Sequence, residues 1–349
     1  MKMDEVVRVQ GLETQRATKG GPVGLGIPLL SVRDLTVEYA TSEGWLPAVE
    51  DVSFDLQSGE FLSIVGESGC GKSTLLFAVA QLLEPGVAQV RGTVLYGGRD
   101  MVQLSERELR AIRWKNYSVV MQSAMNALNP VKTIGSQFRD ALRAHGWKDA
   151  GANEERSREV LQLVRIDAAH LKSYPHQLSG GMRQRAMIAM ALLFTPDLII
   201  MDEPTSGLDV VAQRAMMLQI RELQSRFGFA AIFVTHDMSL VAHFSERVLV
   251  MYAGQVVEQA TTQALLETPL HPYSKALLEA FPSLSGPRVR LKGIPGAPPA
   301  LDGMPVGCRF APRCAEEFAE CRGTAPQAYR CGESLVRCLL QRGGDVSRD

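Results

Sequence analysis

Short apolar runs alternate with helical patterns through the middle of the chain. Three nearly continuous apolar runs have the length of strands and lack a polar face, over residues 61–65, 198–201 and 231–234. Strands of this kind are covered on both faces of a parallel sheet. Residues 74–83 have a helical pattern, and helical periods dominate residues 126–194. The pattern predicts an α/β domain over residues 30–265, with a helical subdomain at about 123–195 inserted between strands of its sheet.

Local signals add detail to this domain. Apolar positions from Val32 to Tyr39 indicate an early strand, and Ser105 followed by Glu108 forms a capping box that predicts a helix start. Residues 248–257 resemble a β-hairpin that turns at Ala253 and Gly254.

The two ends of the chain have a different composition. Residues 1–29 contain five glycines and no periodic apolar pattern, so we expect a flexible tail there. After residue 265, four prolines interrupt any long element, at positions 282, 295, 298 and 299. A cysteine-bearing segment follows them. We therefore predict a small C-terminal extension, rich in cysteine, over residues 266–349.

Charge and hydropathy exclude some classes of protein. The 37 basic and 38 acidic side chains nearly balance, which gives no indication of nucleic acid binding. The longest apolar run, residues 186–194, is much shorter than the roughly 20 residues that a membrane-spanning helix needs. Residues 1–9 are charged and do not resemble a secretory signal. We expect a cytosolic protein, in which thiols stay reduced.

The strongest chemical motif lies between the first apolar run and the helix after it. Residues 66–73 read G-E-S-G-C-G-K-S and fit the phosphate-binding pattern G-x-x-x-x-G-K-[ST]. Backbone N–H groups at a helix N-terminus attract phosphate, the lysine reaches the β- and γ-phosphates, and the serine hydroxyl binds Mg²⁺. The predicted nucleotide-binding residues here are Gly66, Ser68, Gly69, Cys70, Gly71, Lys72, Ser73 and Thr74.

A second segment, which ends in two carboxylates, adds the metal ligand and the general base that hydrolysis needs. The apolar run 198–201 ends in Asp202 and Glu203. An aspartate at this position binds Mg²⁺ in phosphate-loop enzymes. Glu203, one residue further on, is placed to act as the general base that polarises the attacking water.

One run resembles a known family. It is Leu178-Ser179-Gly180-Gly181-Met182-Arg183-Gln184-Arg185. It resembles the signature loop of the ABC ATPases, and the resemblance extends over roughly residues 31–260. It implies a RecA-like phosphate-loop core with an antiparallel β subdomain and a helical subdomain. Other matches follow in the family's order: Tyr39 for adenine stacking, Gln122 in the Q-loop (also a Mg²⁺ contact), Asp209 in the D-loop at 206–209, and the switch histidine His236.

The family resemblance also implies a reaction and an assembly. Glu203, Gln122 and His236 would position the water that attacks the γ-phosphate, while Mg²⁺ and Lys72 stabilise the developing charge. Ser179, Gly180 and Gly181 would bind the γ-phosphate of ATP held by a second ABC subunit. One chain has one phosphate loop and one signature, so two subunits must pair head to tail.

Further runs resemble one subclass, the oligopeptide/dipeptide importer ATPases. These are residues 122–130, His271-Pro272-Tyr273 and residues 307–314. Chromosome and repair ATPases are excluded because no sustained heptads separate Lys72 from Ser179, and translation ATPases usually carry two ABC domains. The resemblance implies a peripheral subunit at the cytoplasmic face of the cell membrane, with two membrane-spanning permease subunits and a solute-binding protein as partners. Peptide is the expected solute; nickel or an oligosaccharide would use a similar ATPase.

Five of the six cysteines lie after residue 307. Clustered thiols in a cytosolic protein suggest a metal site rather than disulfides. The spacings of Cys308, Cys314, Cys321 and Cys338 lack the C-x₂-C pairs of common zinc sites. Resemblance to the importer extension implies a [4Fe–4S] cluster held by those four residues. The alternatives are zinc, no metal at all, or an oxidised pair of cysteines, and Cys331 could replace Cys338 as a ligand.

Overall fold

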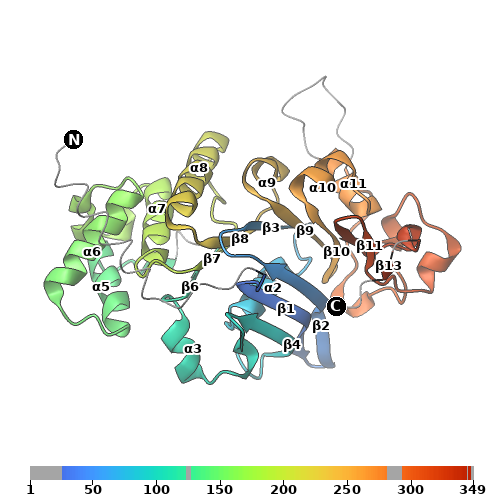
Figure 1. Cartoon of the computed structure of the whole chain (residues 1–349), viewed down its shortest axis with the longest axis horizontal. Helices are drawn as coiled ribbons and strands as arrows, with labels where there is room; N and C mark the ends of the chain where they lie inside the picture. The colour runs from blue at the N-terminus through green and yellow to red at the C-terminus, as the bar shows by residue number, and fades with distance from the viewer. Residues whose placement is uncertain (1–25, 123–126, 281–292, 344, 347–349) are drawn as a thin grey trace.

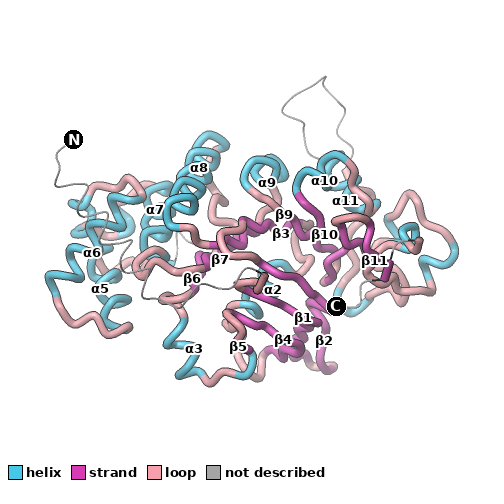
Figure 2. Tube along the Cα trace, in the orientation of Figure 1, coloured by secondary structure: helices cyan, strands magenta, loops and turns pink. Residues whose placement is uncertain are grey.

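The computed structural model describes residues 26–122, 127–280, 293–343 and 345–346. Most of the expected tail and part of the Q-loop run, residues 123–126, lie outside the described residues. The described chain forms two sheets with helices around them (Figures 1 and 2).

A nine-stranded mixed sheet runs through the centre of the molecule. Its strand order is β13-β11-β12-β10-β9-β3-β8-β7-β6, and the neighbours from β9 to β6 are parallel. The strands are β3 (Phe61–Val65), β6 (Tyr117–Val120), β7 (Leu198–Asp202), β8 (Ala230–Val234), β9 (Arg247–Tyr252), β10 (Gln255–Thr261), β11 (Tyr329–Cys331), β12 (Ser334–Val336) and β13 (Asp345–Val346). All residues of β3, β7 and β8 are buried, which confirms the prediction of strands covered on both faces.

A second sheet is antiparallel and has the order β2-β1-β4-β5. Its strands are β1 (Leu30–Thr41), β2 (Gly44–Leu56), β4 (Ala88–Tyr96) and β5 (Arg99–Asp100). Its apolar side chains pack with α2 (Lys72–Val79) against one face of the main sheet, where Ile64 and Ile232 point. The opposite face, with Phe61 and Phe233, packs against the helices drawn above it in Figure 2.

Besides α2, the α-helices of the described chain fall into two groups. Those between β5 and β7 are α3 (Glu106–Ile112), α5 (Ile134–Ala144), α6 (Ala150–Leu163) and α7 (Gly180–Ala191). Those that follow the later strands are α8 (Val210–Phe227), α9 (Met238–Phe244), α10 (Thr262–Glu267) and α11 (Pro272–Glu279). The predicted capping box of Ser105 and Glu108 is confirmed at the start of α3. No helix among the described residues combines the length and apolarity that a membrane crossing requires.

The C-terminal extension continues the main sheet. Strand β12 pairs with β10, so Glu258 lies opposite Val336 and Gln259 opposite Leu335. Figure 1 shows the extension, in orange to red, at the end of the molecule away from the green helices α5 and α6. Because β12 pairs with β10, the extension is stabilised by the main sheet as well as by its own few apolar residues.

A buried arginine joins α6 to the end of α7. Arg156 is 6% exposed; its Nε donates to Leu193 O at 2.8 Å and its Nη2 to Leu192 O at 2.8 Å. These carbonyls belong to the turn after α7, where helix carbonyls lack intrahelical partners. Arg156 therefore satisfies buried acceptors in the helical subdomain.

We predict that Arg156→Met lowers the free energy of unfolding by about 2–4 kcal/mol, because two buried carbonyls lose a charged donor. Chemical denaturation measures this change. The matched control is Arg158→Met on the same helix, which breaks only the exposed pair with Glu154 and should change stability by at most about 0.5 kcal/mol. Equal effects of the two substitutions would contradict the assignment.

Candidate nucleotide-binding site

The phosphate loop joins the end of β3 to the start of α2. Gly66 (φ 153°) and Gly71 (φ 101°) have backbone conformations that favour glycine. A Cβ atom at Gly66 would lie 2.2 Å from Met251 O, and one at Gly71 would lie 2.7 Å from Ala48 O. The motif glycines are required because neighbouring backbone approaches the loop closely.

Lys72 lies across this loop. Its Nζ donates to Gly66 O and to Glu67 O, both at 2.8 Å, and the residue is 7% exposed. Cys70 is also buried, and burial raises the pKa of its thiol. The Tyr39 hydroxyl lies 3.3 Å from Thr74 Oγ1, so the structure places the predicted adenine-stacking residue beside the loop.

Ser73 and Asp202, predicted to bind Mg²⁺, are brought together. Burial raises the pKa of Asp202, and a hydrogen bond from the Ser73 side chain partly offsets this. Asp202 Oδ1 is buried and has no hydrogen-bond partner among the described residues. An unsatisfied carboxylate oxygen beside a hydroxyl group fits a Mg²⁺ ion, which prefers oxygen ligands.

Two predicted catalytic side chains, those of Gln122 and His236, contact a third, that of Glu203. Gln122 Nε2 donates to Glu203 Oε2 at 2.9 Å, and His236 Nδ1 lies 3.2 Å from Glu203 Oε1. Glu203 has φ 43°, a left-handed conformation that is uncommon for a side-chain-bearing residue. Backbone strain of this kind is concentrated at functional sites. The arrangement positions one carboxylate between an amide and an imidazole.

The signature residues stand at the start of α7. Ser179 is exposed and caps the helix, since its Oγ accepts from Met182 N at 3.3 Å. Gly180 and Gly181 form the first turn, with backbone N–H groups that suit an anion. The predicted D-loop residue Asp209 caps α8 by accepting from Ala212 N at 2.9 Å.

Sequence reasoning missed one contact with the phosphate loop. Glu67 occupies a position that the motif leaves unspecified, and it is held by Tyr273 and Arg313 from the C-terminal extension. Both residues lie in runs that resemble the importer extension, which was the available signal.

The expected iron–sulfur cluster is wrong. No group of three or more His, Cys, Asp or Glu side chains in the described parts of the chain is arranged to hold a metal ion. All six cysteines are free thiols, so no oxidised pair forms either. Cys308, Cys314, Cys321 and Cys338 line a cavity of about 10 Å³, which has room for at most one water. Burial raises the pKa of the Cys338 thiol to about 11.

The extension is held together by aromatic packing instead. Phe310 lies 5.2 Å from Tyr252 and 5.3 Å from Tyr273 between ring centroids, in edge-to-face arrangements. Two of these three aromatic side chains belong to the extension and Tyr252 to β9 of the sheet. The clustered thiols and the family resemblance suggested a metal because the extension was considered without this partner.

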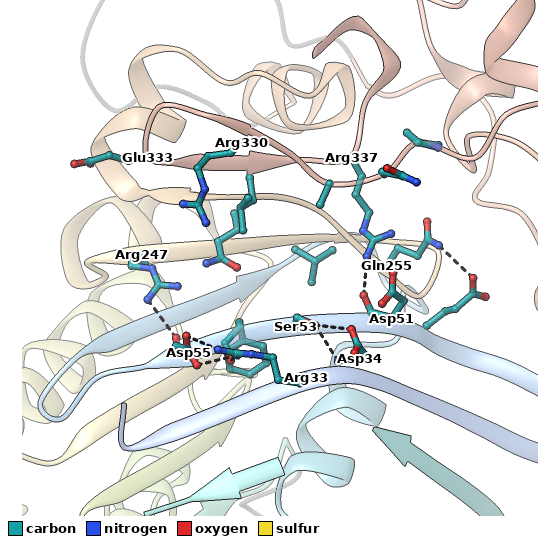
Figure 3. A pocket seen from close by; sticks show the side chains of 18 of the residues that line it. Arg33, Asp34, Asp51, Ser53, Asp55, Arg247, Gln255, Arg330, Glu333 and Arg337 are labelled. Carbon is teal, nitrogen blue, oxygen red and sulfur yellow. Dashed lines mark hydrogen bonds and ion pairs between the residues drawn. The ribbon is translucent and has the colours of Figure 1, made fainter. Parts of the chain in front are cut away.

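A large cleft lies elsewhere. A cleft of about 1060 Å³ separates β2 from the extension, and none of the predicted nucleotide-binding residues lines it within the described chain (Figure 3). Ion pairs line the cleft: Arg33 pairs with Asp55 within one wall at 2.9 Å, and Arg337 of the extension pairs with Asp51 of β2 at 2.6 Å. The cleft is an interface between two parts of the fold, lined by charges that are already paired at these points.

The geometry around Lys72, Asp202 and Glu203 defines a phosphate-loop site for nucleotide hydrolysis. Comparison with known proteins agrees. The sequence model of the family described as ABC transporter matches residues 49–206, and that of the oligopeptide/dipeptide transporter C-terminal region matches residues 257–321.

Curated relatives cover most of the chain. A probable peptide ABC transporter ATP-binding protein of Sinorhizobium fredii is 44% identical, over 85% of this chain and 90% of its own length. The dipeptide transport ATP-binding protein DppD of Bacillus subtilis is 42% identical, over 90% and 95%. The oligopeptide transport ATP-binding protein OppD of Salmonella typhimurium is 44% identical, over 85% and 89%.

A solved structure supports the same assignment. The dimeric ATP-binding cassette MJ0796, bound to ADP and phosphate, is 29% identical with a TM-score of 0.60 and covers 67% of this chain and 98% of its own. The chain therefore belongs to the ATP-binding subunits of ABC transporters. It is an ATPase that binds ATP with Mg²⁺, which confirms the resemblance, the phosphate-loop fold and the activity predicted from the sequence.

We predict that Glu203→Gln retains ATP binding and lowers ATP turnover by about 10²–10⁴-fold, because the amide cannot accept a proton from water. Single-turnover hydrolysis and equilibrium ATP binding measure the two effects separately. Glu222→Gln serves as control, since Glu222 pairs with Arg165 on an exposed surface. Near-normal hydrolysis by Glu203→Gln would rule out the general-base role.

Proposed function

We propose that this chain hydrolyses ATP to power the import of short peptides through separate membrane-spanning permease subunits. The observation that carries the proposal is the joint match to the ABC domain and to the C-terminal region of oligopeptide/dipeptide transporters. Relatives named for peptide, dipeptide and oligopeptide transport support the solute class. The chain would act at the cytoplasmic face of the membrane, and a solute-binding protein would deliver the peptide.

The site residues have separable roles in this proposal. Lys72 and the N–H groups at the start of α2 bind the phosphates of ATP, and Tyr39 stacks on adenine. Glu203 takes the proton from the attacking water, which Gln122 and His236 help to orient. Mg²⁺, held by Ser73 and Asp202, would supply charge neutralisation at the β- and γ-phosphates.

Pairing of two ABC subunits is part of the proposal. The exposed N-terminus of α7 gives Ser179 and Gly180 access to a nucleotide on another subunit. The dimeric state of the solved cassette supports this arrangement. The partner is a second copy or a related subunit, and pairing would move α5 and α6 together with the permease.

The solute class is tested with the assembled transporter. A tagged chain is copurified with its membrane subunits, which are identified and reconstituted in vesicles with their solute-binding protein. We expect ATP-dependent uptake of labelled dipeptide or oligopeptide, and Lys72→Ala to abolish it. Uptake of nickel or of an oligosaccharide in place of peptide would overturn the solute assignment and leave the ATPase assignment intact.

Head-to-tail pairing predicts complementation between two inactive variants. Lys72→Ala removes the phosphate contact and Ser179→Arg blocks the signature, so each homodimer lacks two working sites. A mixed pair restores one site, composed of the intact loop of one chain and the intact signature of the other. The test is made under conditions in which the wild-type activity per chain rises with protein concentration, which shows that subunits pair. Under these conditions we expect mixing of the two variants to restore ATPase activity. No gain on mixing under those conditions, or full activity from a demonstrated monomer, would refute the arrangement.

A further inference from the structure

The C-terminal extension contacts the phosphate loop through the side chain of Glu67. Arg313 Nη1 lies 2.7 Å from Glu67 Oε2, and Arg313 Nη2 lies 3.0 Å from Glu67 Oε1. This is a two-pronged guanidinium–carboxylate pair, the geometry in which arginine binds carboxylates most strongly. The Arg313 side chain is 5% exposed and that of Glu67 is 26% exposed, so water competes little for the pair.

The backbone of the same residue is held by a different part of the extension. Glu67 N–H donates to the hydroxyl of Tyr273 at 2.9 Å, and Tyr273 is fully buried at the second position of α11. Two side chains from separate segments of the extension therefore converge on one residue of the phosphate loop. A contact that served only to attach the extension would not need this position.

Glu67 connects these contacts to the lysine that reaches the phosphates. Its carbonyl oxygen accepts a hydrogen bond from Lys72 Nζ at 2.8 Å. The side chain, N–H and C=O of Glu67 are thus bound by Arg313, Tyr273 and Lys72 in turn. The conformation of the loop around Lys72 is therefore linked to the extension through Glu67.

Arg313 is itself fixed by its surroundings. Its Nε donates to Pro295 O at 2.8 Å, its Nη1 also donates to the Tyr252 hydroxyl at 3.2 Å, and its guanidinium lies 5.7 Å from the centre of the Tyr252 ring. Tyr252 packs against Tyr273, with ring centroids 4.7 Å apart. Since little rotamer freedom remains, the guanidinium is oriented before any nucleotide arrives.

We propose that Arg313 and Tyr273 are positioning residues for ATP binding, which hold Glu67 so that the phosphate loop is preformed. The loop contains three glycines at positive φ, and glycine loses more conformational freedom on ordering than any other residue. When the loop is already ordered before the nucleotide binds, the free energy of binding does not include the entropy cost of ordering the loop. The extension then has a function inside the ATPase itself, beyond peptide transport.

This proposal accounts for two sequence runs that the catalytic chemistry leaves unused. Tyr273 comes from the run His271-Pro272-Tyr273, and Arg313 comes from residues 307–314, the run that suggested a metal site. Coupling between two sites is reciprocal, so bound ATP must also strengthen the attachment of the extension.

The test uses the full chain. It measures the Kd of the protein for a non-hydrolysable ATP analogue in the presence of Mg²⁺, together with KM and kcat for ATP. A hydrogen bond to a charged group changes an equilibrium constant by about ten- to a hundredfold. Because Arg313 acts on the nucleotide through Glu67, we expect only part of this factor to appear in the Kd for the nucleotide. We expect Arg313→Gln to raise Kd and KM about five- to thirtyfold and to change kcat by less than about twofold. Tyr273→Phe keeps the ring and should raise Kd about threefold.

The matched control is Arg337→Gln. Arg337 also joins the extension to the rest of the fold, through Asp51 on β2, and its side chain is 17% exposed, but it borders the cleft of Figure 3 rather than the phosphate loop. Its Kd should equal that of the wild type. If Arg337→Gln and Arg313→Gln raise Kd equally, general attachment of the extension is responsible and the proposal is overturned.

A double-mutant cycle makes the test independent of folding defects in one variant. Glu67→Gln breaks the same pair from the loop side, so the double variant Glu67→Gln/Arg313→Gln should have the Kd of either single variant. Additive effects, an unchanged Kd, or a fall in kcat at constant KM would each overturn the proposal. Absence of ATP binding by the wild-type chain would instead contradict the ATPase assignment, which keeps the two failures distinct.

Discussion

The phosphate loop depends on an approach of backbone to backbone that leaves no room for side chains. Met251 O from β9 and Ala48 O from β2 lie within 2.2 and 2.7 Å of the positions that Cβ atoms of Gly66 and Gly71 would take. These carbonyls come from segments far apart in the sequence and on both sheets. The loop has its shape only when β2, β3 and β9 are assembled, so phosphate binding is a property of the assembled fold.

The parallel part of the main sheet supplies the other half of the site. The carboxyl ends of parallel strands meet at one edge of the sheet, which is where ligands bind in such folds. The phosphate loop follows β3, Glu203 follows β7 and His236 follows β8 at this edge. Register between neighbouring strands therefore sets the distances among groups that come from separate parts of the sequence. Glu203, with φ 43°, directly follows β7, which is buried along its whole length.

The extension depends on the ABC domain for its support. Its strands pair with β10, and its aromatic residues pack on Tyr252 of β9. Arg313 and Tyr273 of the extension also contact Glu67 of the phosphate loop, so the ABC domain supports the extension and the extension holds part of the ABC domain. The thiols that suggested a metal site lie in the small space that this packing leaves.

The sequence by itself determined the buried strands, the phosphate loop and the acidic pair after β7, because these are local patterns with a direct physical cause. A helix cap such as Ser105 with Glu108 is equally local and was predicted correctly. The meeting of Gln122 and His236 at Glu203 came from resemblance to a family, since no local rule places residues of different strands together. Only the tertiary structure decided the support of the extension and the role of Glu67. Each depends on which distant side chains come within a few ångströms, and a motif with an unspecified position carries no information about that.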